Sequence, residues 1–181
     1  MKIEGTHSIK APRELVWNLM IDPDVLSRCV PGVQSLEANA DGSYKMALKT
    51  GVGSIKGSYQ GTIKLAEQRA PEHYRMLVDG KGAPGFVKGA GTLDLVAQAD
   101  ATVVTYSGDV SVGGTIASVG QRLILSAAKM MTAQFFAALE AEAAAIVKAE
   151  ENDEPVQTPK QGFFRNVFRA TSKAIKGKLN D

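Results

Sequence analysis

Apolar and polar residues alternate over much of the first two thirds of the chain, and this pattern predicts β-strands. Residues 2–9 form the first alternating segment, and residues 33–112 contain several more, such as the one that holds Tyr44 and Met46. Turn sequences such as Ala40-Asp41-Gly42-Ser43 separate the segments. Strands that follow one another through short turns pair antiparallel. We therefore predict an antiparallel sheet of about seven strands.

Helical spacing replaces the alternation in three places. Leu15 to Met20 follow Pro12, a residue that the first turn of a helix tolerates, and a second short helix covers Val25 to Cys29. The segment from Ala117 to about Lys148 is rich in Ala, Leu, Met and Glu, which favour helix. A helix of about thirty residues is roughly 45 Å long, enough to cross the whole sheet.

The fold class that follows is α+β, with a curved sheet wrapped around the long C-terminal helix and two short helices after the first strand. Glycines inside several predicted strands permit the strong bending that such a sheet needs. One stripe of the long helix is expected to face the sheet. It consists of Ile124, Ala128, Met131, Phe135, Leu139 and Ile146.

The charge of the chain is unevenly distributed. The net charge of the 181 residues is only +2, but residues 160–181 hold six basic side chains and a single acidic one, Asp181. An anionic partner for this tail follows from the asymmetry. The longest strongly apolar run, Met130 to Leu139, is shorter than the roughly 20 residues that span a bilayer. We expect a cytoplasmic or peripheral protein that does not span the membrane.

The tail has the pattern of an interfacial amphipathic helix. At 100° per residue its large apolar side chains fall on one half of the wheel and most basic residues on the other. Docking on a partner protein or on the chain's own domain is the alternative. The predicted membrane-binding residues are Lys160, Phe163, Phe164, Arg165, Val167, Phe168, Arg169, Lys173, Ile175, Lys176 and Leu179.

These patterns divide the chain into three parts. Residues 1–148 form the sheet-and-helix domain. Residues 149–159 are acidic and polar, contain two prolines and are predicted to be a flexible linker. Residues 160–181 form the basic amphipathic helix.

No arrangement of residues predicts catalysis. The spacing Gly80-Lys81-Gly82-Ala83-Pro84-Gly85 matches a dinucleotide motif, but β-like residues follow it, so a hairpin turn is favoured. His7 and His73 have no helical partner histidine, and a lone Cys29 forms neither a zinc motif nor a disulfide. We expect no catalytic residue, no metal and no nucleic-acid partner.

Four strings resemble one protein family. They are Cys29-Val30-Pro31-Gly32-Val33, the segment from Gly53 to Gly61, the segment from Gly82 to Gly89, and Val112-Gly113-Gly114-Thr115-Ile116-Ala117-Ser118-Val119-Gly120-Gln121-Arg122-Leu123-Ile124. Over about residues 1–147 the chain resembles the CoxG family of carbon monoxide dehydrogenase subunits. This family belongs to the START-like (SRPBCC) superfamily, whose helix-grip fold encloses an apolar ligand cavity.

The resemblance implies a non-catalytic accessory protein at the cytoplasmic face of the cell membrane. Members of the family accompany molybdenum-containing dehydrogenases such as aerobic carbon monoxide dehydrogenase. They are associated with recruiting that enzyme to the membrane and with holding a respiratory quinone, menaquinone or ubiquinone, as its electron acceptor. No covalent cofactor is implied; the isoprenoid quinone is a bound ligand.

Apolar residues on the predicted strands and helices are the candidates for lining a ligand cavity. Two alternatives remain open: a membrane adaptor or lipid binder with no quinone, and a small enzyme that would use polar groups such as Tyr59, Tyr106 and His7. The candidate lining residues are Trp17, Met20, Leu26, Val30, Leu48, Ile55, Tyr59, Met76, Phe86, Leu123 and Met131.

Overall fold

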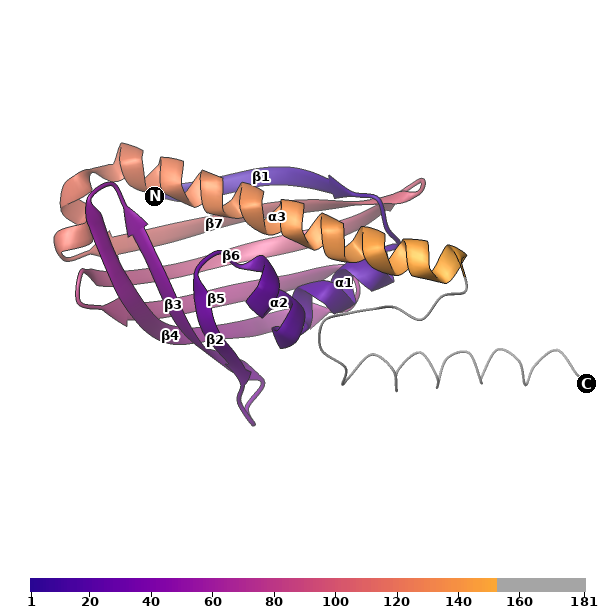
Figure 1. Ribbon diagram of the computed structural model, residues 1–181, viewed down its shortest axis with the longest axis horizontal. Coiled ribbons are helices and arrows are strands. Elements are labelled where there is room, and N and C mark those ends of the chain that lie inside the picture. Colours follow the sequence, from indigo (N-terminus) through magenta and orange to yellow (C-terminus); the bar gives the residue numbers. More distant parts are fainter. Residues whose placement is uncertain (153–181) are drawn as a thin grey trace, which may run out of the picture. The chain divides into compact units, whose positions relative to one another are not determined.

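Seven antiparallel strands form one sheet in the computed structural model, which describes residues 1–152 (Figure 1). The strand order is β1-β7-β6-β5-β4-β3-β2, so each strand from β2 to β6 pairs with the next along the chain, and β1 pairs with β7 to form the far edge. This confirms the predicted antiparallel sheet. The strands are β1 (Lys2–Ile9), β2 (Val33–Ala38), β3 (Ser43–Val52), β4 (Ile55–Arg69), β5 (His73–Gly82), β6 (Gly85–Gln98) and β7 (Ala101–Gly113).

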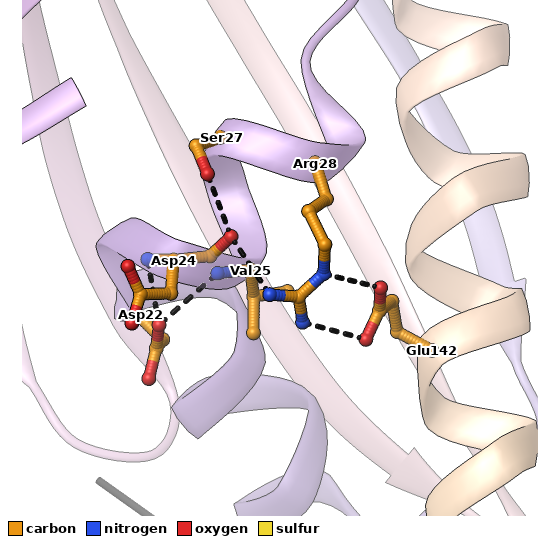
Figure 2. A network of polar contacts seen from close by, with 6 residues as sticks. All are labelled: Asp22, Asp24, Val25, Ser27, Arg28 and Glu142. Atoms are coloured by element: carbon orange, nitrogen blue, oxygen red, sulfur yellow. Dashed lines mark hydrogen bonds and ion pairs between the residues drawn. The ribbon is translucent and has the colours of Figure 1, made fainter. Parts of the chain in front are cut away.

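Two short helices follow β1, as predicted. They are α1 (Arg13–Ile21) and α2 (Pro23–Cys29). Asp22 separates them because its Oδ1 accepts hydrogen bonds from the backbone N–H groups of Asp24 (2.8 Å) and Val25 (3.1 Å), which caps α2 (Figure 2). Pro23 occupies the first turn, where its missing N–H costs nothing.

The long helix α3 (Gln121–Glu151) follows a short 3₁₀ helix, η1 (Thr115–Val119). Figure 1 shows α3 running along one face of the sheet, with α1 and α2 on the same face. The helix starts later than the predicted Ala117, because Gly120 has a left-handed φ of 91° that the α-helix does not accept.

At its C-terminus α3 also extends further than expected. The sequence predicts a linker from residue 149, but the helix continues to Glu151 because Ala and Glu favour helix. Met1–Val147 form one compact unit, and a second unit begins at Lys148. The remaining linker residues and the predicted tail helix, residues 160–181, lie outside the described residues.

Glycines meet across neighbouring strands at the centre of the sheet. Gly61 pairs with Gly80, and Gly91 pairs with Gly108. A Cβ atom on Gly108 would lie only 2.9 Å from the Cα of Gly91, so a larger residue at position 108 would force β6 and β7 apart. Close approach of this kind allows the strong bend that lets the sheet curve towards α3.

Helix α3 is long and apolar enough to cross a membrane by length and composition alone. The core helix of a globular fold passes the same test. Its buried residues are Phe136, Leu139, Ala143 and Ile146, so part of α3 is packed as such a core helix. Leu139 and Ile146 belong to the predicted stripe, whereas Phe136 takes the buried position predicted for Phe135.

Candidate ligand-binding face

The strand register places one set of apolar side chains on the inner face of the sheet, the face that carries α3. Along β4 and β5 the pairs Ile63–Val78 and Leu65–Met76 lie on this face. Residues between them, such as Lys64, are exposed on the outer face. Because side chains alternate between the two faces of a strand, the pairing of neighbouring strands continues this inner face from β1, through β7, β6, β5 and β4, to β3.

One end of the inner face is fully packed. Ile9, Leu95 and Val104 are at most 1% exposed, and Leu19 of α1 and Leu139 of α3 are completely buried. Complete burial of five aliphatic side chains from five elements is what a close-packed protein interior requires. At this end the sheet, α1 and α3 form the solid core of the domain.

Trp17 and Met20, two candidate lining residues, belong to this packed end. Trp17 is 4% exposed, and its ring meets Tyr74 edge-on with a centroid distance of 5.5 Å. Met20 is 2% exposed. Both therefore contribute to packing and leave no surface for a ligand.

The other end of the inner face is incompletely covered. Its side chains are partly exposed even on the central strands β5, β6 and β7, although α3 runs along this face (Figure 1). All the buried residues of α3 lie between Phe136 and Ile146, so the first half of the helix covers the sheet loosely. The partly exposed inner-face residues include Met46, Leu48, Ile55, Ile63, Met76, Val78, Val87, Val110 and Val112.

Contacts between α3 and this end involve adaptable side chains. The hydroxyl of Thr50 on β3 lies 3.9 Å from the sulfur of Met131. Leu123 and Met130 are 51% and 57% exposed, which is unusual for large apolar residues on a core helix. At 100° per residue both lie on the side of α3 opposite the buried Leu139, so they face away from the sheet. Met131 is the residue of this half of α3 that reaches the loosely covered end of the sheet.

An aromatic cluster lies where α3 changes from loose to tight packing. Phe136 stacks on His7 with a centroid distance of 4.8 Å and on Tyr106 at 5.5 Å. Gly5 makes room for this arrangement, because a Cβ there would lie 2.6 Å from Cζ of Tyr106. The cluster therefore marks the boundary between the packed end and the loosely covered end of the inner face.

Three buried polar side-chain atoms in the described part of the chain have no hydrogen-bond partner: His7 Nε2, Arg13 Nε and Tyr59 Oη. His7 Nε2 still lies 3.7 Å from the carboxylate of Glu140, and Arg13 donates to Glu72 through Nη1. Burial raises the pKa of Tyr59, so this hydroxyl stays protonated at neutral pH.

Cys29 is buried and unreactive. It is 3% exposed, and burial raises the pKa of its thiol to about 11, helped by the nearby carboxylate of Glu142. A thiol without an accessible thiolate is a poor nucleophile. Within residues 1–152 no three His, Cys, Asp or Glu side chains are placed to hold a metal ion.

The structure brings together only part of the candidate lining set. Tyr59, Leu48, Ile55 and Met76 share the inner face, and Met131 reaches it from α3. Leu26 and Val30 are partly exposed on α2 and just after it.

Phe86 is misplaced in the prediction. It pairs with Lys81, shares the outer face with Lys88 and is 38% exposed. The two-residue turn at Ala83 and Pro84 sets the register of β6 and directs Val87 inwards instead. Leu123 lies at the exposed start of α3. Val78, Val110 and Val112 also lie on the inner face but are not among the candidates, although the alternation beginning at Val104 and Met76 could have identified their side of the sheet.

Comparison with known proteins gives a family and a fold. A family model described as the CoxG subunit of carbon monoxide dehydrogenase matches residues 5–144. A conserved protein from Geobacillus kaustophilus is 36% identical, with a TM-score of 0.76 over 80% of this chain and 95% of that chain. No curated protein matches the sequence.

More distant structures share the fold alone. A START superfamily protein from Mycobacterium smegmatis is 13% identical, with a TM-score of 0.60 over 80% of this chain and 98% of that one. The Zhui aromatase/cyclase from Streptomyces sp. R1128 is 14% identical, with a TM-score of 0.60 over 83% and 97% of the two chains. These similarities confirm the predicted START-like, helix-grip fold.

Proposed function

Because the chain belongs to the CoxG family of carbon monoxide dehydrogenase subunits, whose fold here is START-like, we propose that it is an accessory protein that carries an isoprenoid quinone. The quinone, menaquinone or ubiquinone, binds between the inner face of the sheet and the first half of α3. The tail holds the protein at the cytoplasmic face of the membrane, and a molybdenum-containing dehydrogenase docks on it.

The observation that carries this proposal is the uneven burial of the inner face. Apolar side chains on central strands are normally buried, and each square ångström withdrawn from water contributes about 25 cal/mol. Here Met76, Val78 and Val110 keep part of their surface exposed while the opposite end is tightly packed. An apolar ligand that covers these side chains would gain the burial that the chain itself does not supply.

The side chains at this end fit an isoprenoid chain. Met46, Met76 and Met131 are flexible and polarizable, so they adapt to a ligand of irregular shape. Leu48 and Ile55 add apolar surface from β3 and β4. When bound, the quinone would supply two-electron acceptor chemistry; the residues of this chain would bind it, orient it and exclude water.

The partner of the proposed carrier follows from the family name, which implies association with a carbon monoxide dehydrogenase. A quinone held by a protein at the membrane surface would be presented to a soluble redox enzyme outside the hydrocarbon core of the bilayer. The carrier would thus connect a dehydrogenase to the membrane quinone pool without performing the redox reaction itself.

The tail supports the membrane part of the proposal through its sequence. Phe163, Phe164 and Phe168 supply apolar anchors, and each basic residue near an anionic leaflet contributes about 1 kcal/mol. Attachment at the leaflet would place the domain where quinone is extracted.

An enzymatic role, the alternative suggested by the fold of an aromatase/cyclase, would use the polar candidates Tyr59, Tyr106 and His7, which the structure does not bring together around one point. His7 and Tyr106 lie on β1 and β7 against Phe136. Tyr59 lies on β4, three strands from β7, or roughly 14 Å along the sheet. A cyclase or hydrolase site would need such groups around a single reacting atom.

Lipid extraction of the purified full-length protein followed by mass spectrometry tests the carrier against the adaptor. A carrier should yield an isoprenoid quinone in near-stoichiometric amount. Protein that yields only bulk phospholipid, or no lipid, and that also fails to take up added quinone, would contradict the carrier and favour a membrane adaptor.

A further inference from the structure

Tyr59 has the strongest unmet hydrogen-bonding requirement on the inner face. Its side chain is 6% exposed, and its hydroxyl is buried with no partner in the part of the chain that the structure describes. The other two buried unpaired atoms belong to side chains that have an ionic partner, Glu140 for His7 and Glu72 for Arg13. Among residues 1–152, Tyr59 has neither an ionic nor a hydrogen-bonding partner.

A buried hydroxyl without a partner is costly. Leaving it unsatisfied destabilises a folded protein, and phenylalanine would fill the same space at no such cost. Tyr44 shows the usual solution on the same sheet, because its hydroxyl donates to the carbonyl oxygen of Ile21 at 2.7 Å. Tyr59 has no such partner among residues 1–152, so its hydroxyl is free to meet a group that these residues do not supply.

The residues that pair directly with Tyr59 or flank it on β4 offer no polar side chain. Across the strands Tyr59 pairs with Leu48 and Gly82, and along its own face of β4 it is flanked by Gly57 and Gly61. The nearest polar side chain further along the inner face of β3 is that of Thr50, whose hydroxyl is directed at the sulfur of Met131. A Cβ on Gly82 would lie 3.1 Å from Cδ1 of Tyr59, so the glycine leaves room for the ring. A water molecule needs two to four polar partners, which these neighbours do not provide through their side chains.

The position of Tyr59 also suggests which part of a ligand it meets. It lies four residues from Ile55 at the start of β4, about 13 Å from the β3–β4 turn, among the loosely covered residues of the inner face. The surrounding apolar side chains suit a hydrocarbon body, while the hydroxyl suits one oxygen atom of that ligand.

We propose that the Tyr59 hydroxyl donates a hydrogen bond to a carbonyl oxygen on the ring of the bound ligand. It thereby selects carbonyl-bearing ring ligands over plain hydrocarbons and fixes the ring at β4. The inference rests on the proposed quinone-carrier function and deepens it, because it assigns one residue to the polar head of the ligand.

Two probes and two variants of the full-length protein test this assignment. The probes are a short-chain menaquinone and the matching naphthalene with the same isoprenoid chain but no carbonyl oxygens. The variants are Tyr59→Phe and the control Tyr44→Phe, which removes a hydroxyl that already has a partner. Binding is followed by quenching of Trp17 fluorescence or by calorimetry, and the melting temperature of each unliganded variant is recorded.

Tyr59→Phe should weaken menaquinone binding about 5- to 10-fold, the size of one net hydrogen bond, and leave binding of the naphthalene unchanged. Its melting temperature should equal or exceed that of the wild type. Tyr44→Phe should lower the melting temperature and leave the ratio of the two affinities unchanged.

Other outcomes separate failure of this inference from failure of the function. If the wild type binds menaquinone and Tyr59→Phe binds it equally well, the assignment of Tyr59 is wrong and the carrier stands. If Tyr59→Phe weakens both probes equally and melts earlier, the hydroxyl is structural and the assignment is again wrong. If the wild type binds neither probe, the proposed function fails and the inference fails with it.

Discussion

Arg28 on α2 donates two nearly parallel hydrogen bonds to the carboxylate of Glu142 on α3, with Nε–Oε1 at 2.8 Å and Nη2–Oε2 at 2.9 Å (Figure 2). The two residues are 114 positions apart, and their side chains are 29% and 21% exposed. Nη1 of Arg28 also donates to the carbonyl oxygen of Asp24, which fixes the guanidinium on its own helix. The pair therefore ties α2 to the tightly packed half of α3.

The geometry predicts a measurable coupling between these side chains. In a double-mutant cycle of Arg28→Met and Glu142→Gln, the coupling free energy of unfolding should be about 1 kcal/mol, since paired hydrogen bonds in a partly buried site exceed an exposed ion pair. Denaturant unfolding measures it. The exposed pair of Lys2 and Glu4 serves as the control and should show no measurable coupling. Strictly additive effects at Arg28 and Glu142 would contradict a structural role for the pair.

Filling the inner face from the sheet should block ligand binding. Gly80 lies in the loosely covered region, and a Cβ there would have only one neighbour within 4 Å, the carbonyl oxygen of Val87 at 3.7 Å. We expect Gly80→Leu to fold normally and to weaken quinone binding at least about 10-fold, because the new side chain occupies the ligand's place. Titration with a short-chain quinone checks this.

Lys81→Leu is the matched control, since it adds the same side chain one position along β5 on the exposed outer face. Its affinity for quinone should equal that of the wild type. Equal binding by Gly80→Leu and Lys81→Leu, with both proteins folded, would show that the ligand does not use the inner face.

The tail is expected to carry the membrane attachment. Deletion of residues 160–181, or the double change Phe164→Glu with Phe168→Glu, should abolish co-sedimentation with anionic liposomes because it removes the apolar anchors. High salt should weaken binding of the wild type without eliminating it, since apolar burial is not screened.

A variant with Asn166→Glu and Asn180→Glu adds the same two charges on the predicted polar side of the tail helix. It should retain partial and less salt-sensitive binding, because the apolar anchors remain while the net basic charge of the tail falls. If the tail deletion still sediments with anionic liposomes to the extent of the wild type, attachment through the tail is wrong.

Local patterns predicted the elements because each depends on nearby residues. Alternation identified the strands around Tyr44 and Tyr59, and helical spacing identified α1 and α3. The hairpin at Gly82-Ala83-Pro84-Gly85 follows from the β-like residues after it and is confirmed.

The composition of the candidate site was less predictable because it depends on contacts between distant residues. Whether Trp17 is packed and Met76 partly exposed depends on where α3 lies over the sheet, and this depends on the bend at pairs such as Gly91–Gly108. Phe136 is buried in place of Phe135 because His7 and Tyr106 stack on it, a contact that helical spacing does not encode.

Methyl NMR of the full-length protein titrated with short-chain menaquinone tests the ligand face most directly. Methyl signals of Leu48, Ile55, Val78 and Val110 should shift with saturation, because the ligand covers them. Signals of Leu19, Leu95 and Leu139 in the packed end should remain in place. Saturable shifts confined to the packed end or the outer face, or no shift at any concentration, would contradict binding between the loosely covered sheet and α3.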